Sequence, residues 1–507
     1  AMAVGPDGSV FLTHRKAHQI LVYGPDGRFV RAIGREGGRA ARGAWQPDGL
    51  RNPQGIAVDA KGRLWVTEED SSPKRVSVWA ADGQLVCDFV GPTGYGGTGA
   101  TADSADKTRV FGSGCEFRLD YAANRAVPVT ALGEVAGQFL RVDGREYFMS
   151  KGGRLYLRTG DTLRCVAAIG NPGVKDLGGF KNIPLPEVPK GTHGYATQSF
   201  IWSDLNDDGQ AQAEEVVNGS RWSGWEVMKY PVGTSGYFGS YWLDEGFNIR
   251  SLANESHGAY GGRPQMLVKT PLKGWTPGGA PIWDVASQVK LTEGTVTGGC
   301  LHIAADGFTV AGAPLAGVRD DGTVVWTYKD NWHGVHGSHN APIPERDDLL
   351  VGTLGTVGRV KTPLGTVFGM HSNMGRLYLM TTDGLFVASV FQDCRLGGEP
   401  WPGQARPGAP LGGVTMGSEW FGGHLFQAEK TGETYLIAGF TAYNLIRLNG
   451  IETLQAVPGS GVKVTGADVL AAEELARQRL ARAAAARSLT IAAMAAPPTV
   501  DGKLDEF

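Results

Sequence analysis

The sequence predicts an all-β protein, a β-propeller of roughly seven to eight blades, followed by a C-terminal helix. The first observation is an internal repeat, in which residues 57–67 (AVDAKGRLWVT) match residues 3–13 (AVGPDGSVFLT). The second is the pattern inside each copy, where short alternating apolar runs flank turns that contain Gly, as in β-hairpins. The third is the count of 76 Gly residues without a collagen-like period, which indicates many tight turns between short strands.

The repeat continues beyond its first hairpin. Residues 19–28 (QILVYGPDGR) match residues 75–84 (RVSVWAADGQ), and weaker copies follow at 151–158, 320–326, 374–386 and 434–437. A four-stranded unit that recurs every 40 to 55 residues or so is typical of a propeller blade. We therefore expect residues 1–463 to form the propeller. The stretch from about 170 to 255 has the weakest repeat and is interpreted as a decorated blade with long loops.

The composition changes after residue 463. Residues 469–487 are rich in Ala, Glu, Leu and Arg and contain neither Gly nor Pro, which predicts a helix within the segment 464–490, with Asp468 as its N-cap. Residues 491–507 are expected to be a linker and the truncated start of a further module.

Composition and charge exclude several classes of protein. A net charge of −3 argues against a nucleic-acid-binding protein, and no apolar run is long enough for a membrane span. The five cysteines lack the paired spacing of zinc ribbons or haem attachment sites. We expect a monomer.

A calcium-binding motif occupies residues 204–215 (DLNDDGQAQAEE). In the EF-hand pattern, oxygen ligands stand at loop positions 1, 3, 5, 7, 9 and 12, and a glycine at position 6 allows the chain to reverse. The predicted ligands are Asp204, Asn206, Asp208, the backbone carbonyl of Gln210, Gln212 and Glu215. The flanking residues do not look helical, so we expect a structural calcium ion and not a regulatory switch. Because calcium is plentiful outside cells, a secreted or periplasmic protein is expected.

Histidines supply the candidate catalytic groups. Three lie within residues 331–340 (NWHGVHGSHN), and others are isolated on separate predicted blades. Loops from different blades meet at the mouth of a propeller's channel, so distant imidazoles can converge there for acid–base work or as ligands of a second metal. The alternative is that they are ordinary hydrogen-bonded loop residues. The predicted catalytic set is His193, His336, His339 and His371.

Aromatic residues cluster between residues 222 and 242. Their flat faces suit stacking on sugar rings, although ordinary blade cores also contain Trp and Tyr. The predicted substrate-binding set is Trp222, Trp225, Tyr237 and Tyr241.

Two stretches resemble known families. Residues 52–66 (NPQGIAVDAKGRLWV) and 75–79 (RVSVW) resemble NHL-repeat propellers, a family that includes binding scaffolds and metal-dependent enzymes. Residues 497–507 (PPTVDGKLDEF) look like the opening strand of a family 9 carbohydrate-binding module, and the sequence stops before the sugar site of such a module. This second resemblance implies that the parent protein handles polysaccharide.

The functional expectation is therefore an exported, calcium-binding propeller that binds a polysaccharide or oligosaccharide and cleaves it, as a lyase or a glycoside hydrolase. Two alternatives stay open. One is a non-catalytic propeller scaffold that binds carbohydrate or protein. The other is a zinc-dependent lyase or lactonase acting on a small molecule, as some NHL-type propellers are.

Overall fold

The structure is a computed structural model of the chain. It describes residues 1–69, 73–91, 99–134, 136–170, 200–218, 228–230, 232, 241–253, 264–291, 296–297, 302–305, 307–311, 315–328, 330, 332, 337–346, 349–399, 401, 408–409, 411–419, 422–439, 443–459 and 463–486. Contacts divide the chain into two units, 1–454 and 455–507.

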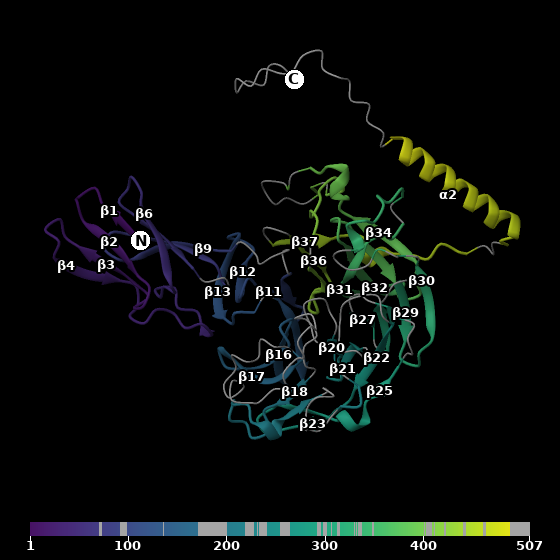
Figure 1. Cartoon of the computed structure of the whole chain (residues 1–507), viewed down its shortest axis with the longest axis horizontal. Helices are drawn as coiled ribbons and strands as arrows, with labels where there is room; N and C mark the ends of the chain where they lie inside the picture. Colours follow the sequence, from purple (N-terminus) through teal and green to yellow (C-terminus); the bar gives the residue numbers. More distant parts are fainter. Residues whose placement is uncertain are drawn as a thin grey trace, which may run out of the picture. The chain divides into compact units, whose positions relative to one another are not determined.

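Two four-stranded antiparallel sheets come first, and they share one core (purple in Figure 1). The first sheet consists of β1 (Met2–Val4), β2 (Val10–His14), β3 (Gln19–Tyr23) and β4 (Phe29–Ile33). The second consists of β6 (Pro53–Val58), β7 (Leu64–Glu68), β8 (Arg75–Trp79) and β9 (Leu85–Val90). The hairpins predicted from the repeat are thus confirmed in both copies.

The following sheets are also antiparallel and use neighbouring strands in chain order. The third sheet contains β10 (Thr101–Asp103), β11 (Asp106–Gly112), β12 (Cys115–Asp120) and β13 (Arg125–Ala131), and β5 (Gly43–Ala44) pairs with β13. The fourth contains β14 (Gly137–Val142), β15 (Arg145–Ser150), β16 (Arg154–Thr159), β17 (Thr162–Ile169), β18 (Phe200–Ser203) and β19 (Val216–Asn218).

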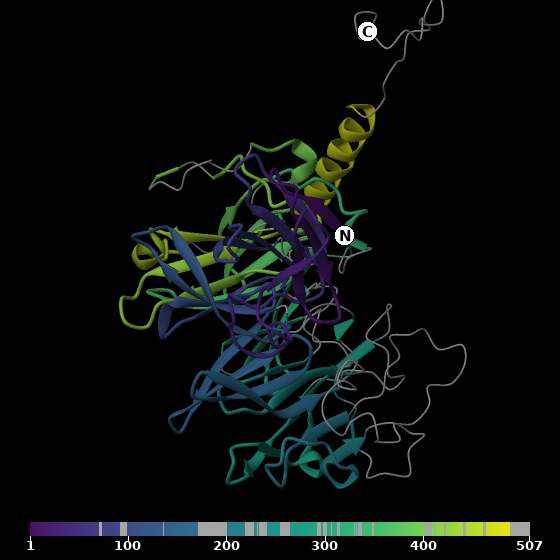
Figure 2. The same ribbon diagram turned by 90° about the vertical axis from the view of Figure 1, so that its left-hand side faces the viewer.

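The fifth sheet lies beside the fourth (blue to teal in Figure 2). It contains β20 (Tyr241–Leu243), β21 (Ile249–Ala253), β22 (Pro264–Thr270), β25 (Val289–Lys290) and β26 (Val296–Thr297). A separate hairpin is formed by β23 (Leu272–Trp275) and β24 (Pro281–Trp283).

The last two sheets complete the β-structure. One contains β27 (His302–Ala305), β28 (Phe308–Ala311), β29 (Leu315–Arg319) and β30 (Val324–Tyr328). The other has seven strands, β31 (Thr353–Thr362), β32 (Gly365–Ser372), β33 (Leu377–Thr381), β34 (Phe386–Val390), β35 (His424–Gln427), β36 (Thr434–Ala438) and β37 (Asn444–Leu448). Its two halves, β31–β34 and β35–β37, join through one parallel residue pair, Gly358 and Leu425.

The sheets from β10 to β37 pack one on the next, and the last returns to the first. Phe111 of the third sheet meets Phe148 of the fourth, with ring centroids 4.4 Å apart. At the other end of the series, Ala102 of β10 packs in one cluster with Phe426 and Ile437. Burial of both faces of each sheet is what a propeller blade requires, so the predicted all-β, propeller-type fold is present.

The grouping of the blades follows from these contacts. In the described residues, the strand groups β10–β13, β14–β19, β20–β26, β27–β30, β31–β34 and β35–β37 form the closed series. The first two sheets pack on each other instead. A repeat period predicts that blades are present, but only their packing decides which blades belong to one closed ring.

The second unit contains the helix α2 (Gly466–Ala486), drawn in yellow in Figure 1. It begins earlier than predicted, and Asp468 lies in its first turn. The backbone N–H and the hydroxyl of Thr465 donate to Asp468 Oδ2, at 2.7 and 2.6 Å, so Thr465 and Asp468 stabilise the helix start together. Among the described helical residues, none forms a stretch long and apolar enough to cross a membrane.

Candidate functional site

A histidine–carboxylate pair joins two connections of the last sheets. His339 lies in the connection from β30 to β31, and its Nε2 is 3.2 Å from Oε1 of Glu419, in the connection from β34 to β35. Both side chains are partly exposed, at 39% and 27%. Because antiparallel strands alternate in direction and β35 runs parallel to β31, both connections leave the sheet at the same end.

Glu419 is held in an unusual backbone conformation. Its φ is +58°, a left-handed value that is uncommon for a residue other than Gly, Asn or Asp. Asn373, wholly buried in the turn between β32 and β33, fixes it by accepting the Glu419 backbone N–H with both its side-chain oxygen (2.8 Å) and its carbonyl (3.0 Å). Strained residues held by their surroundings concentrate at functional sites.

A buried aspartate anchors the connection that carries His339. The carboxylate of Asp330 accepts hydrogen bonds from the backbone N–H groups of Trp332, Gly352 and Thr353, and from the Thr353 hydroxyl. It is completely buried. The two ends of the connection are therefore tied together, which limits how far His339 can move.

The other predicted catalytic residues differ in placement. His371 lies in β32 and is only 5% exposed, so it is a core residue at the end of the strand, two positions before Asn373. His193 and His336 lie outside the described residues. The structure therefore places His339 at an accessible surface and gives it a carboxylate partner.

The predicted sugar-binding aromatics are described at one position. Tyr241 is buried in the core cluster between the fourth and fifth sheets, where its hydroxyl donates to the carbonyl of Lys151 at 3.4 Å. This placement leaves no exposed ring face for a sugar. Trp222, Trp225 and Tyr237 lie outside the described residues.

The predicted calcium loop connects β18 to β19. Its first and last predicted ligands, Asp204 and Glu215, are buried, whereas Asn206, Asp208 and Gln210 are exposed. Two hydrogen bonds from Gly209 N–H, both 3.2 Å, reach the carboxylate of Asp204. Glu215 accepts from Trp202 Nε1 at 2.9 Å and from Leu205 N–H at 2.8 Å. Burial raises the pKa of Asp204, whose side chain is fully enclosed. The two buried carboxylates, Asp204 and Glu215, are oxygen ligands of the kind that a calcium ion binds.

Two further observations bear on the fit of a cation. The Oε1 atom of Gln212 is buried and accepts no hydrogen bond, while its Nε2 donates to Asp208 Oδ2 at 2.8 Å. A buried oxygen without a donor suits a cation ligand. No group of three or more His, Cys, Asp or Glu side chains among the described residues is gathered as a metal site, so this loop would rely on amide and backbone oxygens as well.

The loop is tied to the neighbouring hairpin through Asp207. This carboxylate accepts from Thr276 Oγ1 and from Gly278 N–H, each at 2.7 Å, in the β23–β24 turn. Arg164 of β17 bridges the same two parts, donating to Asp204 at 2.6 Å and to the Gly278 carbonyl at 2.9 Å. The loop is therefore a clamp between sheets.

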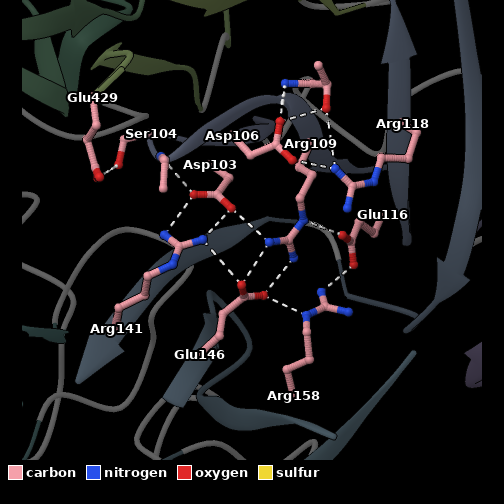
Figure 3. A network of polar contacts seen from close by, with 12 residues as sticks. Asp103, Ser104, Asp106, Arg109, Glu116, Arg118, Arg141, Glu146, Arg158 and Glu429 are labelled. Atoms are coloured by element: carbon pink, nitrogen blue, oxygen red, sulfur yellow. Dashed lines mark hydrogen bonds and ion pairs between the residues drawn. The ribbon is translucent and has the colours of Figure 1, made fainter. Parts of the chain in front are cut away.

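A cluster of charged side chains joins the third sheet to the fourth. Arg109 of β11 binds Asp103, Glu116 and Glu146 at 2.6 to 2.8 Å, and Figure 3 shows Arg158 closing the network from β16. Burial disfavours the charged form of Glu146, but hydrogen bonds from the arginines outweigh it and lower its pKa to about 2. These side chains satisfy one another and join the third sheet to the fourth.

His424 connects the last sheet of the closed series to the first. It begins β35, and its Nδ1 accepts the backbone N–H of Ala102 in β10 at 3.0 Å. Burial lowers its pKa to about 4, with Lys151 adding to the effect, so the imidazole is neutral. His424 is therefore a structural residue.

Sequence reasoning missed Glu419, Asn373 and Asp330. None belongs to a recognisable motif, and Glu419 lies far from His339 along the chain. Positive φ at a glutamate has no sequence signal, so these residues could be found only from the folded chain.

Comparisons with known proteins add little. No protein-family model matches the sequence, and no curated protein matches it. Among solved structures, the chain is similar to virginiamycin B lyase from Staphylococcus aureus, with 10% identity, TM-score 0.22, and 87% of this chain and 91% of that one covered. BamB from Moraxella catarrhalis (10% identity, TM-score 0.26, 89% and 94% covered) and the Dos1 propeller (10%, 0.29, 89% and 93%) are further examples. Scores this low carry no argument, and the fold rests on the sheets of this chain.

Proposed function

We propose that this propeller binds a polysaccharide and cleaves it, with His339 and Glu419 as the proton-transfer pair. The observation that carries the proposal is their 3.2 Å contact at a partly exposed surface. A carboxylate that holds one ring nitrogen fixes the tautomer and leaves the other nitrogen to exchange a proton with a substrate. The sugar substrate class is supported by the resemblance of residues 497–507 to a carbohydrate-binding module.

The lyase version of the reaction removes one proton and breaks one bond. Nδ1 of His339 would take the proton from the carbon next to a uronate carboxylate. The electron pair left behind forms a carbon–carbon double bond and expels the glycosidic oxygen, which takes up a proton. In the hydrolase version, the imidazolium or Glu419 would protonate the glycosidic oxygen as its bond to the anomeric carbon breaks, and water would attack that carbon and give up a proton to solvent.

We further propose a structural calcium ion in the loop from residue 204 to 215, held by Asp204, Asn206, Asp208, Gln210, Gln212 and Glu215. Support for it comes from the spacing of these residues, the buried Asp204 and the unbonded Oε1 of Gln212. An export to a calcium-rich compartment belongs to the same proposal. A second metal near His339 is tested by metal analysis after dialysis, where stoichiometric zinc would favour the zinc-lyase alternative.

The test is incubation with a panel of uronate-containing and neutral polysaccharides. We expect either new ultraviolet absorbance from unsaturated uronates, which identifies a lyase, or new reducing ends without it, which identifies a hydrolase. Neither signal with any substrate would overturn the catalytic proposal.

A second candidate is a scaffold that binds polysaccharide without cleaving it. The burial of His371 favours it, because that placement removes one of the expected catalytic groups from the surface. Retained polysaccharide binding with no turnover, unchanged in the His339→Ala variant, would support this candidate.

A further inference from the structure

The first sheet has apolar residues on both faces. The face toward the second sheet carries Phe11, Ile20, Val22 and Ile33, all buried. By the strand register, the opposite face carries Met2, Val4, Val10, Leu12, Leu21, Tyr23, Phe29 and Ala32. Met2, Val4 and Phe29 are 64%, 57% and 58% exposed. We call these eight residues the leading face. An apolar leading face is unusual. Side chains alternate along each strand between the two faces of a sheet, and the exposed face normally carries polar residues.

The second sheet has a matching open surface. Opposite its buried face, the register places Ala57, Trp65, Thr67, Val76, Val78, Cys87 and Phe89, which we call the trailing face. Val78 is wholly buried within this face, and Ala57, Thr67, Cys87 and Phe89 are exposed. Phe89 is 55% exposed and stacks on Trp65, with ring centroids 6.1 Å apart. Sheet faces that are exposed to solvent usually carry polar residues, and both of these faces are largely apolar.

The internal repeat makes the two open faces complementary. The first sheet's buried residues Phe11, Ile20, Val22 and Ile33 correspond in the repeat to Trp65, Val76, Val78 and Phe89 of the trailing face. On the second sheet's inner face, the buried residues Leu64, Val66 and Trp79 and the partly buried Leu85 correspond to Val10, Leu12, Tyr23 and Phe29 of the leading face. At these positions the open faces repeat the two surfaces that already pack together within the chain. The leading face is the more apolar copy, because its Leu21 and Ala32 correspond to Ser77 and Asp88.

We propose that these faces bind a second copy of this chain, with the leading face of one copy packed on the trailing face of the next. The contact would repeat the packing between the two N-terminal sheets. It is head-to-tail, so successive copies form a closed ring or a growing chain of molecules. This inference is independent of the proposed polysaccharide chemistry, and it replaces the monomer expected from the sequence.

The test combines two variants, each of which introduces a charge on one of the two apolar faces. Phe29→Glu places a charge on the leading face, and Phe89→Glu places one on the trailing face. Sedimentation over about a hundredfold range of concentration should show the native chain associating beyond its 53.7 kDa mass, and each variant alone staying monomeric. An equimolar mixture of the two variants should form a dimer and nothing larger, because one intact face of each kind remains. The control Leu385→Glu, at a 63% exposed turn residue of the last sheets, should associate like the native chain.

Each alternative gives a different result. A face-to-face dimer through two leading faces would survive Phe89→Glu, and association through other parts of the chain would survive both substitutions; either result overturns the proposal. A native chain that stays at 53.7 kDa throughout also overturns it and leaves the faces to another protein. Cys87, an exposed free thiol on the trailing face, gives a second measurement: association should slow its labelling by a maleimide, and Phe29→Glu should restore the rate.

Discussion

Nε2 of His339 lies 3.2 Å from Oε1 of Glu419, although the two residues are separated by 80 positions in the chain. They meet because two connections leave the sheets at the same end, and because Asn373 fixes the backbone of Glu419. This pairing turns one histidine of a His-rich segment into a candidate proton-transfer group.

We predict that both His339→Ala and Glu419→Gln reduce polysaccharide turnover, by about 10² to 10⁴ for the histidine and less for the glutamate. The reason is that His339 would exchange the proton and Glu419 would orient it. Turnover rates with the best substrate of the panel measure the effect. His14→Ala, a change at an exposed histidine of the first sheet, should leave turnover unchanged. Equal activity in the native chain and His339→Ala contradicts the assignment.

Calcium should raise stability through the loop from residue 204 to 215. A ligand present at 100 times its dissociation constant stabilises the folded state by about 2.7 kcal/mol. We therefore expect a chelator to lower the melting temperature and calcium to restore it. Glu215→Gln should lose most of this response, while Glu214→Gln, next to it and exposed, should keep it. A melting temperature that changes with neither chelator nor calcium would mean that the loop binds no calcium.

Because the loop is clamped to the β23–β24 hairpin, we predict that substitution of Gly278 destabilises the fold. A Cβ at this residue would lie 2.2 Å from the carboxylate of Asp207, so Gly278→Ala must displace the two hydrogen bonds there. We expect a loss of about 1 to 3 kcal/mol in the free energy of unfolding, measured by urea denaturation. Gly274→Ala, in the same hairpin, meets no atom within 4 Å and is the control. Similar losses in both variants would contradict the clamp.

His424 predicts a pH dependence of stability. Its pKa is about 4 in the folded chain, lowered first by burial, whereas an unfolded histidine titrates near 6.5. Between these values the unfolded state binds the additional proton, so stability falls as the pH drops from 6.5 to 4, by about 3 kcal/mol for this group. Urea unfolding across this window measures the slope. His424→Asn keeps an acceptor for Ala102 N–H and should show a smaller slope; an identical slope would rule His424 out as its source.

The arginine network predicts unequal effects of two substitutions. Arg109→Ala leaves three acidic side chains without their central partner in a mostly buried site, and should cost about 3 to 5 kcal/mol of stability. Arg118→Ala removes a half-exposed ion pair with Asp106 and should cost about 1 kcal/mol or less. Thermal or urea unfolding compares the two. Equal costs would show that the cluster does not act as a buried unit.

The sequence by itself determined the local β-structure. The match between residues 3–13 and 57–67 located the hairpins, because alternating apolar residues and glycine turns act over a few residues. The pattern from Asp204 to Glu215 predicted a loop in the same way, because it is contiguous in the chain, and a loop lies there between β18 and β19. Calcium binding by this loop stays a prediction. The helix was predicted from composition, and its start was misplaced because the Thr465–Asp468 contacts are a detail of geometry.

Only the tertiary structure decided which sheets belong to the closed ring of blades and which distant side chains contact each other. His424 and Ala102 join the first and last sheets of the closed series, and the N-terminal sheets pack on each other instead. The same limit applies to Tyr241, for which the sequence left a sugar site and a blade core open and which is buried. It applies also to Glu419, which belongs to no motif and contacts His339. A period or a motif depends on neighbours along the chain, whereas burial and long-range contacts depend on how the sheets pack together.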